Sequence, residues 1–195
     1  MKIAVIDNYD SFTYNLVHLV NSLNDTPVDV FRNDMPDMEL LEEYEGLILS
    51  PGPGIPVEAG LLNNIIKEYA ARKSIFGVCL GMQAIAEVFG GKLLNLPGVY
   101  HGVETEISAV QPPHRIFKDL PVTFVAGRYH SWIVQNEELP ANIEVTAIDE
   151  GNNIMALAHK EYDVCGVQFH PESIMTPSGK KILANWMNIE LKTDK

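Results

Sequence analysis

The sequence predicts an α/β domain with a mostly parallel central sheet, helices on both faces and an added antiparallel portion. In the first half, short apolar runs alternate with amphipathic segments of helical periodicity. Nearly continuous apolar runs are typical of parallel strands buried on both faces. In the second half, turn residues separate short segments, a pattern that favours antiparallel strands and hairpins.

In the first half, each apolar run that predicts a strand is followed by a turn or by a helical pattern. The expected strands are residues 2–6, 28–31, 46–50 and 74–78, and the expected helices are residues 11–23, 57–72 and 80–89. An oxygen of Asp10 or Ser11 is positioned to cap the first helix, since such side chains accept from free N–H groups of a first turn. Gly90 and Gly91 end the third helix.

The second half begins with turn signals such as Leu96-Pro97-Gly98 and Gln111-Pro112-Pro113. We expect residues 92–159 to form antiparallel strands that extend the same sheet. A further buried strand is expected at residues 164–169, and a closing helix at residues 178–190. With no repeat or linker in the sequence, we predict a single domain spanning residues 1–195.

Charge and composition exclude several classes of protein. The chain has 14 basic and 26 acidic residues, so its formal charge is −12, which disfavours nucleic acids and anionic membranes as main partners. No apolar run approaches the roughly 20 residues that span a bilayer. The first apolar run meets Asp7 and lacks a signal-peptide pattern, and two cysteines make no disulfide framework. We therefore expect a cytoplasmic protein.

Cys79 is the first candidate for chemistry, because it lies between Gly77-Val78 and Leu80-Gly81, where an apolar strand gives way to a helix. Flanking glycines permit the tight turn that raises a nucleophile at the tip of a sheet. The positive end of the following helix favours a thiolate. The alternative interpretation is an inert buried cysteine, and we assign that structural role to Cys165.

His170 and Glu172 directly follow the last expected strand, with a proline between them. A thiol nucleophile needs a base within hydrogen-bond reach, and the base needs a group that orients its other ring nitrogen. Together with Cys79, these residues predict a triad for acyl transfer at the strand ends of one sheet. Alone, the motif would be an ordinary surface turn.

A third element, Pro51-Gly52-Pro53-Gly54, ends the strand at residues 46–50. Glycine allows the backbone to approach a ligand closely. An N–H of this turn and the N–H of Leu80 would together form an oxyanion hole. The simpler interpretation is a sharp turn.

These three elements, in this order, resemble the class I glutamine amidotransferases, the triad glutaminase domains with a Cys–His–Glu site. The resemblance runs nearly from end to end, through DNYDSFTYNL, SPGPG, GVCLGMQAIAEVFGG, RYHSW and GVQFHPES. Within that superfamily, the first two motifs resemble the glutaminase component of anthranilate synthase or of aminodeoxychorismate synthase. The resemblance implies a three-layer, flavodoxin-like fold.

The resemblance also implies roles for single residues. Cys79 matches the family nucleophile, His170 the general base and acid, and Glu172 the residue that orients the histidine. The implied substrate-binding and oxyanion residues are Gly52, Pro53, Gly54, Leu80, Gln83, Ser131 and Trp132. Two positions depart from the subgroup: Met82 replaces a frequent histidine, and Trp132 stands where leucine is more usual.

The implied activity is hydrolysis of L-glutamine to glutamate and ammonia through a cysteine thioester. The resemblance further implies a separate chorismate-binding synthase subunit that receives the ammonia and makes anthranilate, or 4-amino-4-deoxychorismate, or both. We expect no cofactor in this chain and Mg²⁺ only in the partner subunit. None of His18, His114 and His159 has metal-ligand spacing, so no metal site is expected. The alternatives are a stand-alone γ-glutamyl hydrolase and a non-catalytic regulatory subunit.

Overall fold

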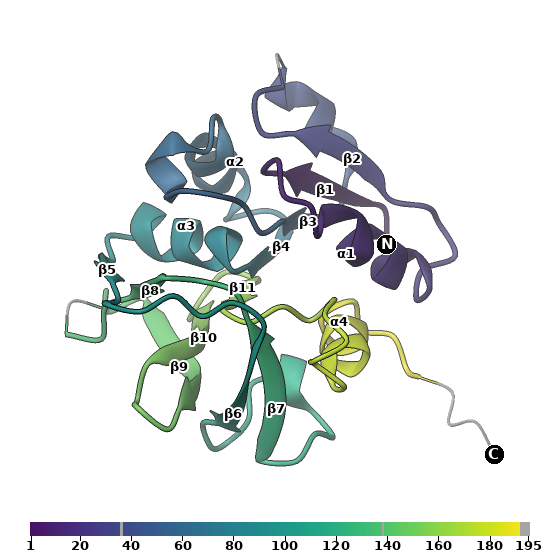
Figure 1. Ribbon diagram of the computed structural model, residues 1–195. Helices are drawn as coiled ribbons and strands as arrows, with labels where there is room; N and C mark the ends of the chain where they lie inside the picture. Colours follow the sequence, from purple (N-terminus) through teal and green to yellow (C-terminus); the bar gives the residue numbers. More distant parts are fainter. Residues whose placement is uncertain (36, 138, 192–195) are drawn as a thin grey trace.

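The computed structural model describes residues 1–35, 37–137 and 139–191, and in this part nine strands form one sheet. Its parallel portion has the order β2-β1-β3-β4-β11 (Figure 1). The bounds are Ile3–Asp7 for β1, Asp29–Arg32 for β2, Gly46–Leu49 for β3, Ser74–Val78 for β4 and Val164–Val167 for β11. β1 lies between β2 and β3, so the chain first adds a strand on one side of β1 and then adds β3, β4 and β11 on the other. This order is the flavodoxin-like one, in which sites form at the carboxyl ends of the strands.

Helices cover both faces of the parallel strands (Figure 1). α1 (Thr13–Asn21) and α4 (Gly179–Trp186) pack on one face, against side chains such as Val5 and Phe76. α2 (Leu62–Tyr69) and α3 (Leu80–Val88) pack on the other, against side chains such as Ile6 and Ile75. Successive residues of a strand point to opposite faces, so each strand supplies both cores. The three-layer α/β fold predicted from the sequence is confirmed.

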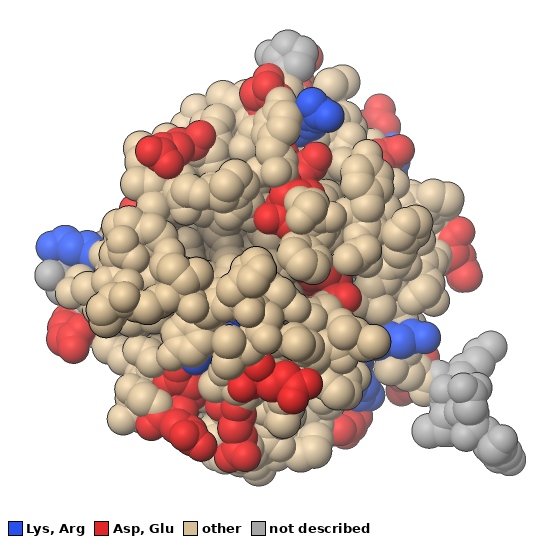
Figure 2. All heavy atoms as spheres, in the orientation of Figure 1, with Lys and Arg blue, Asp and Glu red and all other residues tan. Residues whose placement is uncertain are grey.

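The antiparallel portion continues the sheet beyond β11 in the order β10-β9-β6-β7. Its strands are β6 (Val103–Ala109), β7 (Thr123–Arg128), β9 (Ile143–Asp149) and β10 (Ile154–His159). A separate pair joins β5 (Leu93–Asn95) to β8 (Trp132–Val134). Short 3₁₀ segments lie at Met38–Glu43, Pro56–Glu58 and Arg115–Phe117. Carboxylates gather over β6 and β7 on the face that Figure 2 shows.

Two local expectations need correction. The helix expected at residues 57–72 is divided, because Gly60 adopts a φ of +56° and a Cβ there would lie 2.6 Å from the carbonyl oxygen of Asn33. The first helix begins at Thr13 with Phe12 as its N-cap residue, and no side chain caps it. Asp10 instead accepts a hydrogen bond from the Phe12 N–H at 2.7 Å, and it lies two residues before the N-cap position.

Other elements also end earlier than the sequence predicts. The strand expected at residues 164–169 stops at Val167, the strand at 46–50 stops at Leu49, and the helix at 178–190 stops at Trp186. Asn188, just beyond this last helix, has a φ of +56° and leaves the helical conformation. The single-domain interpretation stays a prediction.

Candidate active site

The backbone at Cys79 is strained in the way that a tight strand-to-helix turn requires. Cys79 lies between β4 and α3 with φ +51° and ψ −103°, a region that L-residues rarely adopt. A Cβ on Gly81 would lie 2.4 Å from the carbonyl oxygen of Leu49, and a Cβ on Gly77 would lie 2.5 Å from the backbone of Gly81. Glycine is therefore required on both sides of the cysteine.

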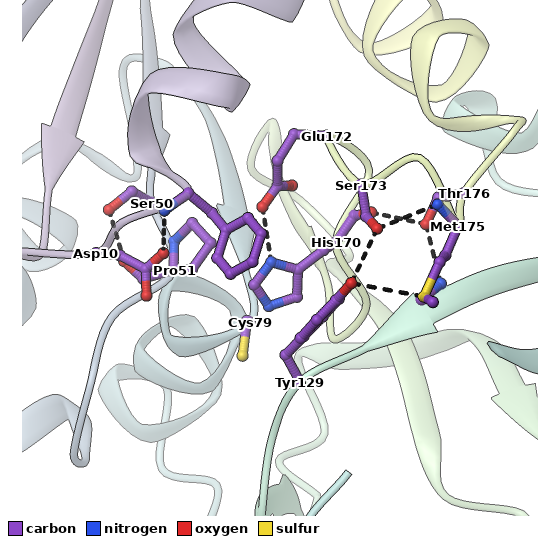
Figure 3. Close-up of polar contacts among 12 residues, drawn as sticks. Asp10, Ser50, Pro51, Cys79, Tyr129, His170, Glu172, Ser173, Met175 and Thr176 are labelled. Carbon is purple, nitrogen blue, oxygen red and sulfur yellow. Dashed lines mark hydrogen bonds and ion pairs between the residues drawn. The ribbon is translucent and has the colours of Figure 1, made fainter. Parts of the chain in front are cut away.

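The sheet brings the second candidate pair to the same place. β11 pairs with β4 in parallel, with Val167 opposite Val78, and the Cys79 N–H donates to the Val167 carbonyl at 2.8 Å. His170 follows three residues after β11 and its Nδ1 lies 2.6 Å from Oε1 of Glu172. Figure 3 shows the imidazole between this carboxylate and Cys79. The three residues predicted as a triad thus lie together at the carboxyl edge of the sheet.

The surroundings of His170 favour its charged form. Burial lowers the pKa of His170, but the neighbouring Cys79 and Glu172 outweigh that effect and raise it to about 10. The side chains of His170 and Glu172 are almost completely buried. Among the described residues, the buried Nε2 of His170 has no hydrogen-bond partner. This nitrogen is therefore available to exchange a proton with a thiol or with a leaving group.

Two aromatic rings hold the imidazole in place. The rings of Tyr129 and Phe12 lie with their centroids 4.9 Å and 5.6 Å from that of His170, both edge-on. The Tyr129 hydroxyl in turn lies 3.2 Å from the hydroxyl of Ser173 (Figure 3). Such packing restricts the ring to one orientation.

A cavity of about 220 Å³ opens beside the sulfur of Cys79. Predicted residues of the Pro51–Gly54 turn, of α3 and of the segment at β8 line this cavity. Val99, Tyr129 and His130 also line it, although the sequence did not indicate them as substrate-binding. Its lining comprises Gly52, Pro53, Gly54, Cys79, Gln83, Val99, Tyr129, His130, Ser131 and Trp132. Leu80 does not line the cavity with its side chain, which is buried, but it is the first residue of α3.

The Pro51–Gly54 turn is fixed by the strand ends beneath it. The Asn8 side chain donates to the carbonyl of Ser50 at 2.8 Å, and the Asn8 N–H donates to the Ser50 hydroxyl at 2.9 Å. A Cβ on Gly52 would lie 2.5 Å from Leu80 Cδ2 and 2.6 Å from Asn8 Cβ. Gly54 has a φ of +72°. This turn and the start of α3 are consequently packed face to face, as an oxyanion hole built from both would need.

His130, which lines the cavity, is held by Arg128 and by the backbone of Trp132. Nδ1 of His130 lies 3.0 Å from the carbonyl oxygen of Trp132, and the Arg128 Nε–H donates to His130 Nε2 at 3.1 Å. Burial and the charge of Arg128 lower the pKa of His130 to about 3, so its ring is neutral. Arg128 itself pairs with Asp149 at 2.8 Å, and both side chains are buried.

Sequence reasoning missed Arg128 and Gln168, and gave His130 no defined role. Gln168 lies next to Cys79 because the two residues follow Val167 and Val78, which are paired in the sheet. The contact depends on the register of β11 against β4, so local sequence patterns carry no signal for it. Cys165 is buried, and burial raises its pKa to about 12, as expected of an inert thiol.

Other kinds of site receive no support within the described residues. No group of three or more His, Cys, Asp or Glu side chains there is arranged to hold a metal ion. In the same part of the chain, no helix has the length and apolar character needed to cross a membrane.

Comparison with known proteins decides the family. The model of the family "Glutamine amidotransferase class-I" matches residues 4–189. The chain belongs to the class I glutamine amidotransferases. This glutamine amidotransferase is 46% identical over 187 residues to the aminodeoxychorismate/anthranilate synthase component 2 of Bacillus subtilis, with 95% of each chain covered.

Two further relatives carry one of these names each. The anthranilate synthase component 2 of Azospirillum brasilense is 46% identical over 189 residues, covering 95% of both chains. The aminodeoxychorismate synthase component 2 of Escherichia coli is 42% identical over 189 residues, covering 95% of this chain and 99% of the relative. A crystal structure of a protein described as a subunit of GMP synthase, from Thermoplasma acidophilum, superposes with a TM-score of 0.85 at 26% identity. It covers 96% of this glutamine amidotransferase and 92% of the other chain.

Proposed function

We propose that this amidotransferase hydrolyses L-glutamine through a thioester on Cys79 and supplies the ammonia to a chorismate-binding synthase subunit. One observation carries the proposal: a strained cysteine, a buried His170–Glu172 pair and a glycine turn meet at one cavity. Anthranilate is the product we propose for the partner. The relatives named for aminodeoxychorismate synthase favour 4-amino-4-deoxychorismate, or both products, as the alternative.

In the first half-reaction, the Cys79 thiolate attacks the side-chain amide carbon of glutamine. The oxygen of that amide gains negative charge, and backbone N–H groups near Gly54 and Leu80 stabilise it. His170, charged because of its raised pKa, donates its Nε2 proton to the departing nitrogen. The carbon–nitrogen bond breaks, and ammonia leaves behind a γ-glutamyl thioester on the sulfur.

In the second half-reaction, the now neutral His170 accepts a proton from water, and the resulting hydroxide attacks the thioester carbonyl. The bond to sulfur breaks, glutamate leaves and the thiolate forms again. Glu172 keeps Nδ1 of the imidazole protonated, so Nε2 is the nitrogen that exchanges protons with the reactants. Gln83, Ser131 and Trp132 line the cavity where the α-amino and α-carboxylate groups of the substrate would lie.

A partner subunit is supported by the names of the relatives, which are components of synthases. Val99 adds a structural argument, because it lines the cavity and yet is 74% exposed. Leu94 and Val103, near it in sequence, are also exposed apolar residues. Val103 and Val99 also line a neighbouring hollow together, and exposed apolar side chains that lie together are typical of a surface that another protein covers.

Labelling with a diazo-ketone analogue of glutamine tests the glutaminase activity. We expect one adduct per chain, mapped to Cys79, that excess glutamine prevents. An adduct on Cys165, or labelling unaffected by glutamine, would contradict the proposal. If the free chain does not react, labelling is repeated with the synthase subunit present, and continued lack of reaction would indicate a non-catalytic subunit.

Ammonium rescue tests the division of labour between subunits. With the synthase subunit present, Cys79→Ser is expected to abolish product formation from glutamine but not from added ammonium. A chain that hydrolyses glutamine at its full rate without any partner would instead be a stand-alone γ-glutamyl hydrolase. Assaying anthranilate and 4-amino-4-deoxychorismate with each candidate synthase identifies the product.

A further inference from the structure

A buried amide lies against the sulfur of Cys79 and has no part in the triad. Gln168 follows β11 directly and its side chain is completely buried. Its Nε2 lies 3.5 Å from Cys79 Sγ, within hydrogen-bond range for sulfur. A buried amide needs partners for both its oxygen and its nitrogen, so the donors and acceptors around it determine which way the amide is turned.

The hydrogen-bond partners decide which end of Gln168 faces the sulfur. The Trp132 carbonyl can only accept, so the Gln83 atom 2.9 Å from it is the amide nitrogen. The same Gln83 nitrogen lies 3.2 Å from the Gln168 side chain, which must therefore present its oxygen there. The amide nitrogen of Gln168 is then the atom that faces Cys79.

The far end of this chain of hydrogen bonds is anchored as well. His130 has an Nε2 that accepts from Arg128, so its Nδ1 carries the proton and donates to the Trp132 carbonyl. That carbonyl consequently has two donors, from His130 and Gln83. Each link therefore has one possible donor: Arg128 and His130 donate toward the Trp132 carbonyl, and Gln83 donates both to that carbonyl and to the Gln168 oxygen. The Gln168 amide nitrogen is left to face the sulfur.

We propose that Gln168 is a further catalytic residue of this site, whose amide N–H donates to Cys79 Sγ and stabilises the thiolate that attacks glutamine. Gln83 is the positioning residue that keeps the amide turned this way. A hydrogen bond to an ionised acceptor is roughly twice as strong as a neutral one, so the contact favours the thiolate over the thiol. The inference rests on the proposed function for its meaning in catalysis, but the contact itself does not.

The other titratable groups around the site are on neighbouring elements. His170 comes from the segment after β11, with Glu172 behind it. Tyr129, whose ring packs against His170, and His130 come from the segment between β7 and β8, and the Arg128–Asp149 ion pair lies behind His130. The substitutions below leave all of these in place, so a change in thiol reactivity reports on the amide.

The test is the rate at which iodoacetamide alkylates Cys79 in the whole chain, measured against pH and followed by peptide mass mapping. Gln168→Met has a similar shape and no donor, and Gln168→Glu keeps an acceptor for Gln83 but presents a carboxylate to the sulfur. In Gln168→Met the midpoint of the pH–rate profile is expected to rise by about one to two pH units, the value of one hydrogen bond to a charged group. In Gln168→Glu the rise is expected to be larger.

Gln111→Met is the matched control, because Gln111 is exposed and follows the end of β6, whereas the start of β6, at Val103, is the end that pairs with Arg128 beside the site. The midpoint of Gln111→Met is expected to equal that of the unchanged chain. Circular dichroism identifies any variant that does not fold. In that event Gln83→Met, which frees the Gln168 amide to rotate, provides the second measurement, with a smaller rise expected. Unchanged midpoints in folded Gln168→Met or Gln83→Met, or an equal shift in the control, would overturn the proposal.

Failure of this inference is distinguishable from failure of the proposed function. Alkylation by iodoacetamide needs neither glutamine nor a partner, whereas the diazo-ketone experiment depends on glutamine recognition. If the alkylation midpoint shifts in Gln168→Met but glutamine does not prevent diazo-ketone labelling, the contact between Gln168 and Cys79 is supported and the glutaminase activity is refuted.

Discussion

The contact between Glu172 and His170 predicts how far the pKa of His170 falls when the carboxylate is removed. Replacing Glu172 with glutamine keeps the shape of the side chain and removes its charge, where Oε1 lies 2.6 Å from Nδ1 and both groups are buried. A hydrogen bond to a charged group is worth about 1.5–3 kcal/mol. At about 1.36 kcal/mol per pKa unit, the pKa of His170 should fall from about 10 by about one to two units.

This change has two consequences for Glu172→Gln. If the same energy is lost from the transition state, glutamate release slows by about 10- to 100-fold. The alkaline limb of the rate profile moves to lower pH, because His170 must be protonated to release ammonia. The assay is glutamate release at saturating glutamine between pH 6 and about 10, with the synthase subunit present where the free chain is inactive.

Glu106→Gln provides the control for Glu172→Gln, since Glu106 is an exposed residue of β6 and its replacement should leave both rate and profile unchanged. An unaltered rate and an unaltered alkaline limb in Glu172→Gln would refute the assignment of Glu172 as the group that orients and charges His170. A slower rate with an unchanged alkaline limb would show that the Glu172 carboxylate orients the His170 ring without changing its pKa.

Three further predictions concern stability. Gly81→Ala places a methyl group 2.4 Å from the Leu49 carbonyl and should lower the free energy of unfolding by about 1–3 kcal/mol in urea titrations, whereas Gly98→Ala, with nothing within 4 Å, should have little effect. The pKa of His130 is about 3 in the fold and near 6.5 when unfolded, so its contribution to stability is present above pH 6.5 and is lost as pH falls toward 3. His130→Asn should therefore flatten the acid limb of a plot of stability against pH, and an unchanged limb would contradict this. Arg128→Met leaves a buried carboxylate without its cation and should cost about 3–5 kcal/mol, measured by thermal and urea unfolding; a cost below about 1 kcal/mol would argue that the pair contributes little.

The sequence by itself determined the layers of the fold and the chemistry that the site can hold. Continuous apolar runs predicted the parallel strands, and their ends carry Cys79 and His170. The local requirement for glycine around Cys79 was likewise visible, because a tight turn between a strand and a helix has few solutions. Element ends were less predictable: at Gly60, a left-handed φ set by packing against Asn33 divided the expected helix.

The tertiary structure alone decided which distant residues meet. Gln168 is 89 positions from Cys79, and only the register of β11 against β4 sets the amide beside the sulfur. The neutral state of His130 likewise depends on burial and on Arg128, since an isolated histidine has a pKa near 6.5. Hydrophobic periodicity is local, and it says which face of each element is buried. Strand register, desolvation and the direction of a hydrogen-bond chain arise only when the elements pack against one another.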